Sequence, residues 1–124
     1  MKIYYAHSQW EYGTPLEDYN LQIIRSAFPS AEIYNPSKFV DEIASEGEIM
    51  LSCFEKIEQS YLVVFSTLSG VVGRGVTQEL LFAESAGKPI YQIYDGKVHL
   101  QQEVKIYPID GEEASGRTFG VVRR

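Results

Sequence analysis

A chain of 124 residues with a formal net charge of −6 at pH 7 is long enough for one hydrophobic core, and its length predicts a single domain spanning residues 1–124. The negative charge argues against recognition of a phosphate backbone, so we expect no nucleic-acid partner. No stretch approaches the roughly 20 apolar residues of a membrane span, and MKIYYA is too short for a secretory signal, so we expect a cytoplasmic protein with no membrane partner.

The first predicted element is a strand at residues 2–6. Its sequence, KIYYA, is apolar and rich in β-formers, and the polar loop HSQWEYG follows it directly. This order is typical of a buried parallel strand that leads into a ligand site.

A helix is predicted to begin at Pro15. Thr14 and Glu17 form a capping box around this proline, and apolar residues follow at helical spacing. The helix should end before Pro29, and EIY at residues 32–34 then predicts a short strand.

Two helices are predicted before the next strand. Phe39 and Ile43 mark a short helix, and a second capping box at Ser45 and Glu48 begins a longer one. Cys53 lies within the apolar pattern of the longer helix, which favours a buried thiol over a nucleophile.

The most apolar stretch, YLVVF at residues 61–65, predicts a strand covered on both faces at the centre of the sheet. A glycine loop follows, then a helix that ends near Gly87, then a strand at 89–94. Because strands and helices alternate, we predict an α/β fold: a small doubly wound parallel sheet of the flavodoxin-like or Rossmann-like kind. Beyond this core at 1–94, short alternating pieces at 95–124 predict a C-terminal β extension, either an antiparallel addition or a dimerisation arm.

The loops at the carboxyl ends of these strands should share one rim, where open parallel sheets bind ligands. They supply nine candidate ligand-binding residues: His7, Ser8, Trp10, Asn35, Ser69, Gly70, Gly73, Arg74 and Gly75. The glycines let backbone N–H groups approach a ligand, and the helix behind them favours a phosphate or a carboxylate. Trp10 offers a face for a nucleobase, and Arg74 could bind a 5′-phosphate through two hydrogen bonds.

Three of these assignments have a plainer alternative. Glycines equally serve a tight strand-to-helix turn, and Arg74 equally serves as a solvated charge. A lone loop histidine such as His7 is more often an ordinary hydrogen-bonding residue than a general acid. The histidines and the single cysteine lack zinc-type spacing, so we predict no metal site and no cofactor.

Glu79 follows the glycine loop, in what we predict to be the first turn of the last helix. The helix dipole stabilises a carboxylate there by about 0.3 to 1 kcal/mol, which by itself would explain an acidic residue. The dipole also favours the ionised form, which could attack an electrophilic sugar carbon or stabilise an oxocarbenium-like centre at neutral pH. We therefore expect Glu79 to be a nucleophile.

Residues 2–94 resemble the nucleoside 2-deoxyribosyltransferase family and its relatives. The matching motifs are IYYAHS, the GxxxE segment from Gly75 to Glu79, the LLFA that follows it, and AGKPIY. The resemblance implies a Rossmann-like fold, cleavage or transfer of an N-glycosidic bond in a small nucleoside or nucleotide, Glu79 as the nucleophile and Tyr4 beside it. It also implies a homo-oligomer, because relatives complete their sites with a neighbouring subunit. More loosely, the GxxxE segment resembles lysine-decarboxylase-like proteins that hydrolyse nucleoside monophosphates.

The chain departs from the transferase pattern at its acidic residues. Ser60 stands where family members carry an aspartate before the central strand, and only Ser69 and Val72 stand where another acid precedes the glycine loop. Loss of a general acid would cost about 10² to 10⁴ in rate. The substitutes that the sequence offers are Glu11, Glu17 and Asp41. The alternatives are therefore a non-catalytic nucleotide-binding or sensing module with the same pocket, or an interaction domain that acts through assembly.

Overall fold

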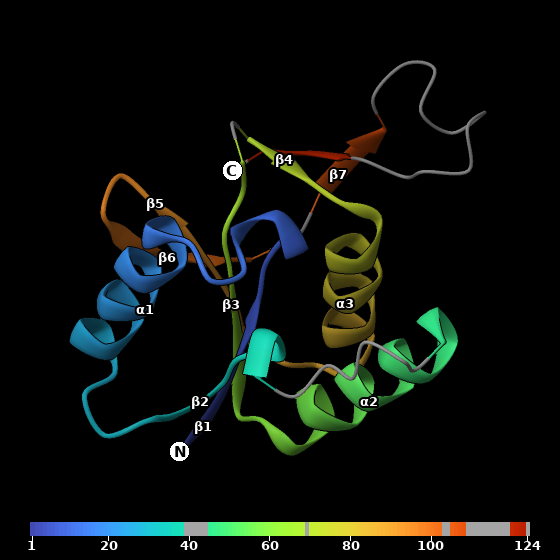
Figure 1. Cartoon of the computed structure of the whole chain (residues 1–124), viewed down its shortest axis with the longest axis horizontal. Helices are drawn as coiled ribbons and strands as arrows, with labels where there is room; N and C mark the ends of the chain where they lie inside the picture. The colour runs from blue at the N-terminus through green and yellow to red at the C-terminus, as the bar shows by residue number, and fades with distance from the viewer. Residues whose placement is uncertain (39–44, 69, 103–104, 109–119, 124) are drawn as a thin grey trace.

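The computed structural model describes residues 1–38, 45–68, 70–102, 105–108 and 120–123. Its centre is a five-stranded sheet in the order β2-β1-β3-β5-β6 (Figure 1). The strands are β1 (Lys2–Ala6), β2 (Glu32–Tyr34), β3 (Leu62–Phe65), β5 (Ile90–Tyr94) and β6 (Lys97–Gln101). The first four are parallel, and β6 runs antiparallel to β5. This order is the flavodoxin-like one of doubly wound sheets, and it confirms the predicted α/β fold.

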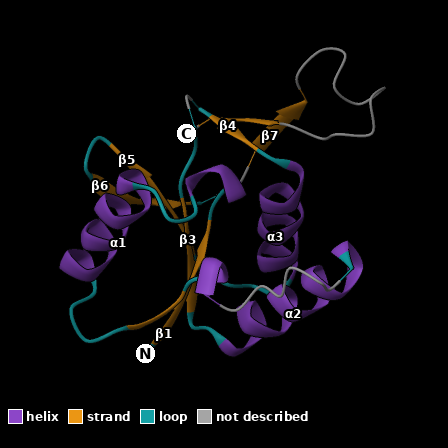
Figure 2. Cartoon of the chain, viewed as in Figure 1, coloured by secondary structure: helices purple, strands orange, loops and turns teal. Residues whose placement is uncertain are grey.

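Helices cover both faces of this sheet (Figure 2). One face carries α1 (Pro15–Ala27), and the other carries α2 (Glu46–Gln59) and α3 (Arg74–Ser85). The first two helices begin at the predicted caps, where the Thr14 and Ser45 hydroxyls accept backbone N–H groups. Among the described residues, no helix combines the length and apolar character needed to cross a membrane.

Alternation along β1 divides its side chains between the two faces. Ile3 and Tyr5 pack on the side of α1, whereas Tyr4 and Ala6 pack on the side of α2 and α3. All four are fully buried, as is nearly all of β3 beside them, which agrees with a central position for the YLVVF stretch. Tyr4 therefore faces α3, the helix that carries Glu79.

The predicted glycine loop contains a strand that the sequence analysis missed. β4 (Val71–Val72) pairs with β8 (Gly120–Arg123), and β8 pairs with β7 (Lys105–Pro108), all antiparallel. Gly70, at φ 78°, closes the tight turn that leads into β4. A two-residue strand is stabilised by its distant partner, so local sequence carries little signal for it. The described C-terminal pieces all pair antiparallel, with β6 on β5 and with β7 and β8 beside β4.

Two short 3₁₀ helices complete the described chain, η1 (Gln9–Glu11) and η2 (Pro36–Lys38). The helix predicted around Phe39 and Ile43 lies outside the described residues. Asp95 and Gly96, at φ 52° and 72°, form the two-residue turn between β5 and β6, as their sequence indicates.

Candidate functional site

A cavity of about 500 Å³ opens at the carboxyl end of β1. This volume falls within the roughly 300–1,000 Å³ that is usual for small-molecule sites. The lining residues come from the loop after β1, from α2, and from the start of α3: His7, Ser8, Gln9, Trp10, Tyr12, Ile49, Met50, Cys53, Gly73, Arg74, Gly75, Val76 and Glu79. Six of the nine predicted ligand-binding residues are among them.

Glu79 and Tyr4 meet beside this cavity. The Tyr4 hydroxyl donates a hydrogen bond to Glu79 Oε2, and the Glu79 side chain is only 5% exposed. Glu79 shares the buried face of α3 with Val76, Leu80 and Ala83. An acid within an apolar helical stripe is a signal of a special site, because burial of an ordinary carboxylate is unfavourable.

Two predictions for Glu79 are wrong: that it lies in the first turn of its helix, and that its carboxyl group is ionised. α3 begins at Arg74, so Glu79 lies in its second turn, where the influence of the helix N-terminus has declined. Burial raises the pKa of Glu79 to about 8, and the Tyr4 hydrogen bond lowers that pKa only in part. Desolvation therefore outweighs the dipole, and the carboxyl group of the ligand-free site is largely protonated at pH 7.

Cys53 of α2 is a buried thiol, as predicted. It also lines the same cavity as Glu79, which the sequence did not indicate. Burial raises its pKa to about 11, and the charge of Glu79 acts in the same direction. A thiol with that pKa is a poor nucleophile at neutral pH. Together with Ile49 and Met50, Cys53 makes α2 an apolar wall of the cavity.

His7 lines the cavity but is only 2% exposed, and both of its ring nitrogens are occupied. Nε2 lies 2.7 Å from Glu17 Oε2, and Nδ1 lies 3.1 Å from the carbonyl oxygen of Tyr5. Neither nitrogen is placed to give a proton to a ligand. The geometry favours the hydrogen-bonding role of His7 over the general-acid role.

Trp10 and Tyr12 are the aromatic residues on the rim. Trp10 is 77% exposed, and Tyr12 is half-buried with its ring 4.9 Å from that of His7. Burial raises the pKa of Tyr12, with the charge of Glu79 acting in the same direction. The Ser8 hydroxyl accepts the backbone N–H of Trp10 at 3.2 Å and so caps η1. Ser8 thus shapes the loop as well as lining the cavity.

Of the glycines in the predicted loop, Gly73 and Gly75 line the cavity. Gly73 is the N-cap of α3, and a glycine provides no side-chain acceptor for the first-turn N–H groups. Gly75 packs close to Met50: a Cβ added to Gly75 would lie 3.9 Å from the Met50 sulfur. Gly70 belongs to the turn before β4 and does not line the cavity, which favours the plainer role for that glycine.

Among the remaining predicted binding residues that the structure describes, Asn35 does not line the cavity. Asn35 is buried, and its Oδ1 accepts the backbone N–H of Ser37 at 3.0 Å. This bond closes a local turn after β2. Ser69 lies outside the described residues.

Two of the three acidic residues considered as proton donors, Glu11 and Glu17, do not line the cavity. Glu11, within the loop after β1, and Glu17, in the first turn of α1, are both buried, and Asp41 lies outside the described residues. Ser60 stands at the amino end of β3, where its hydroxyl donates to Lys56 O at 2.7 Å. Because the cavity lies at the carboxyl ends of the strands, an acid at position 60 would be remote from it. The identity of Ser60 therefore does not decide whether the site holds a proton donor.

Fold and cavity together define an α/β protein of the doubly wound class with a ligand-sized site at the carboxyl edge of its parallel strands. No protein-family model and no curated protein matches this sequence. Among solved structures the chain is similar to a conserved protein from Enterococcus faecalis V583, with a TM-score of 0.64 and 24% identity over 76% of this chain. The chain spans 63% of that protein.

The chain is also similar to the Clostridium botulinum CMP N-glycosidase BcmB, with a TM-score of 0.53 and 15% identity. This match covers 74% of the present chain and 70% of BcmB. At these identities the comparisons establish the fold, which is a Rossmann-like one.

Proposed function

We propose that this chain cleaves the N-glycosidic bond of a small nucleoside or nucleotide, with Glu79 as the nucleophile. The observation that supports this most is the hydrogen bond from Tyr4 to Glu79 Oε2 beside the cavity. Among the described residues, none hydrogen-bonds Oε1, so Tyr4 orients the carboxyl group while leaving one oxygen for a ligand. The fold shared with a protein described as a CMP N-glycosidase suits the same chemistry.

The reaction requires the ionised form of Glu79. Its carboxylate oxygen attacks the anomeric carbon, and the bond from this carbon to the base nitrogen breaks. The base leaves with the bonding electron pair and takes a proton from solvent. Water then attacks the glycosyl-enzyme at the same carbon, the bond from this carbon to the Glu79 oxygen breaks, and the free sugar, the carboxylate and a proton to solvent are released. In a transfer reaction a second base attacks instead, loses its N–H proton to solvent and leaves as a new nucleoside. Because the ligand-free carboxyl is largely protonated at pH 7, the fraction of active protein should rise with pH.

The surroundings of Glu79 suit the parts of a nucleotide. Trp10 provides an exposed aromatic face for the base. Arg74 and the first-turn N–H groups of α3 lie on the cavity wall, where a 5′-phosphate would meet both a guanidinium group and the positive end of a helix. Ile49, Met50 and Cys53 of α2 add an apolar part to the lining of the same cavity.

A second candidate is a binding or sensing module that does not turn its ligand over. Among the described lining residues, Glu79 is the single carboxyl group, and it is largely protonated. A site without a further acid binds a nucleotide more readily than it protonates a departing base.

Incubation with a library of nucleosides and nucleoside monophosphates, followed by chromatography for free base, distinguishes the two candidates. Glu79→Gln is the test variant, and Glu84→Gln, on the exposed side of the same helix, is its control. Base release that Glu79→Gln removes supports the enzyme. If no nucleotide yields free base, and both variants bind nucleotides as the wild type does, the binding module is correct.

The homo-oligomer implied by the family resemblance is part of the same proposal. Light scattering coupled to size-exclusion chromatography measures the mass in solution, to be compared with 14.1 kDa for one chain.

A further inference from the structure

Glu17 joins the two ends of the loop that follows β1. Its Oε2 lies 2.7 Å from His7 Nε2, and its Oε1 accepts the backbone N–H of Gly13 at 3.2 Å. His7 and Gly13 are the first and last residues of this loop, and the side chain of Glu17 is 2% exposed. One buried carboxylate on α1 therefore holds both ends of the segment that carries Trp10 and Tyr12.

This arrangement differs from the capping box that the sequence predicts for Glu17. In a capping box, the glutamate side chain accepts the N–H of its own N-cap residue. Here Thr14 N–H donates to Glu11 O at 3.2 Å, and the Glu17 side chain reaches past Thr14 to Gly13. The Thr14 hydroxyl still accepts Glu17 N–H, so only half of the box forms. The carboxylate is therefore available to the loop.

His7 connects Glu17 to the cavity, because His7 bonds Glu17 and also lines the cavity. Its ring stacks on Tyr5, with centroids 3.8 Å apart and planes 5° apart, and its Nδ1 donates to Tyr5 O. Its other side contacts the Tyr12 ring. Burial opposes the ionisation of Glu17, but the His7 and Gly13 hydrogen bonds hold the pKa of Glu17 below its usual value.

A second buried carboxylate holds the middle of the loop. Glu11 Oε1 accepts from Asn20 Nδ2 of α1 at 3.2 Å and from Ser66 Oγ, after β3, at 3.1 Å. The Tyr5 hydroxyl lies 2.8 Å from the same Ser66 oxygen and 3.0 Å from Asn20 Nδ2. The loop is thus attached to the scaffold at its start, middle and end. The Trp10 side chain, which lines the cavity and is 77% exposed, makes no such hydrogen bond within the described part of the chain.

We infer that Glu17, through His7 and Gly13, is a positioning residue that holds the aromatic loop of the site in its ligand-binding geometry. The inference rests on the proposed function in one respect, that Trp10 and Tyr12 receive the base. A loop fixed before the ligand arrives loses less conformational entropy on binding, so the contribution of Glu17 should appear in affinity rather than in the chemical step. Glu17 is not among the residues that line the cavity.

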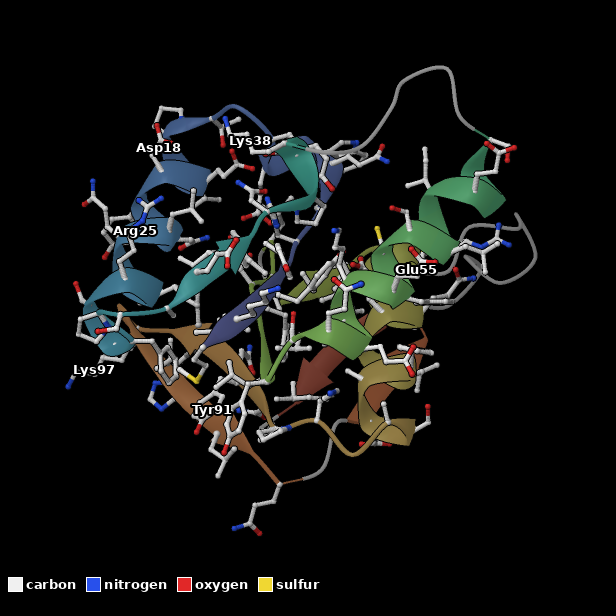
Figure 3. All side chains as sticks on the ribbon, turned by 90° about the horizontal axis from the view of Figure 1, so that it is seen from below. Asp18, Arg25, Lys38, Glu55, Tyr91 and Lys97 are labelled. Carbon is white, nitrogen blue, oxygen red and sulfur yellow. The ribbon has the colours of Figure 1, made fainter. Side chains whose placement is uncertain are left out.

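The test compares Glu17→Ala with Asp18→Ala. Asp18 is the next residue of α1, carries the same charge in the same first turn, and lies on the exposed side of the helix (Figure 3). Trp10 is the only tryptophan of the chain, so its fluorescence anisotropy and its quenching by acrylamide report the loop without any ligand. We expect Glu17→Ala to lower the anisotropy and increase the quenching, and Asp18→Ala to leave both unchanged.

The second measurement uses a nucleoside monophosphate that the wild type binds or cleaves. Glu17→Ala should raise Kd or KM about tenfold. Its kcat should stay within about threefold of the wild-type value, since the substitution leaves the residues around Glu79 unchanged. Glu17→Gln should restore most of the affinity, because its amide can accept from Gly13 N–H and donate to a neutral His7 ring. A variant whose only fault is poor folding would lower the active fraction and therefore kcat, with KM unchanged.

If Glu17→Ala shows no cooperative thermal transition, Glu17→Asp replaces it. The aspartate keeps the charge but is one methylene shorter, so it cannot reach His7 and Gly13 together, and Trp10 should again become more mobile. Trp10 signals and affinities equal to those of Asp18→Ala in the folded variant would overturn the inference. If Trp10 becomes more mobile in the Glu17 variant as expected but the wild type binds no nucleotide, the proposed function is wrong and the positioning of the loop by Glu17 still holds.

Discussion

Tyr4 and Glu79 lie 75 positions apart in the sequence, yet they share a buried hydrogen bond beside the cavity. Parallel strands and the alternation along β1 bring them together, because Tyr4 points from the sheet towards the face of α3 that carries Glu79. The same burial that joins them raises the pKa of Glu79 to about 8. Four predictions follow from this pair and from the residues around it.

Glu79→Gln should reduce release of free base by at least about a thousandfold, because the amide cannot form the glycosyl-enzyme. Chromatography of the reaction products measures the loss, with Glu84→Gln as the control. The glutamine keeps the shape of the side chain, so nucleotide binding should survive. Comparable base release by Glu79→Gln and the wild type would exclude Glu79 as the nucleophile.

The pH dependence of kcat/KM should show a rising limb with a midpoint near pH 8. This parameter reports the free protein, whose Glu79 must lose a proton before it can attack. Tyr4→Phe removes the hydrogen bond that lowers the pKa of Glu79, so the limb should move to higher pH. Initial rates at low substrate concentration between pH 5 and about pH 9.5 measure both curves. A falling limb in this range would instead assign the protonated carboxyl as the active form.

Glu79 should also make the wild type less stable as pH rises from 4.5 to about 8. Its pKa is higher in the folded chain than the ordinary 4.5, so between these values the folded state binds more protons than the unfolded state. Stability is therefore retained below pH 4.5 and lost progressively up to pH 8, at about 1.4 kcal/mol per pKa unit. Glu79→Gln lacks this titration.

The difference in Tm between Glu79→Gln and the wild type measures this effect. It should be small at pH 4.5 and grow towards pH 8, while every other titrating group cancels in the comparison. A difference that does not change with pH would mean that the carboxyl group is ionised in the folded chain.

Arg74→Ala should weaken binding of nucleoside monophosphates by about tenfold or more and leave binding of the matching nucleosides nearly unchanged. Hydrogen bonds to charged groups contribute about 1.5–3 kcal/mol, and only the monophosphate carries the charge that the guanidinium would meet. Titrations followed by Trp10 fluorescence measure both affinities. An equal loss for nucleoside and nucleotide would assign Arg74 to shaping the cavity wall.

Local patterns in the sequence were sufficient for the main elements of the fold. The Thr14 and Ser45 caps, the apolar YLVVF strand and the alternation of strands and helices depend on neighbouring residues, so they predicted the doubly wound sheet correctly. Loop residues after β1 and around Gly73 were also identified as one rim, because the carboxyl ends of parallel strands always lie at the same edge.

Only the tertiary structure decided the burial, the hydrogen-bond partners and the pKa of the acidic residues. Glu79 looked like an ionised first-turn acid, Glu17 like a member of a capping box and Glu11 like a substitute proton donor, yet all three are buried with partners from other elements. Propensity, caps and periodicity act over a few residues and can be seen in a sequence. Desolvation and hydrogen bonding of a carboxylate depend on groups that the fold brings from far along the chain, and they determine its pKa and hence its chemistry.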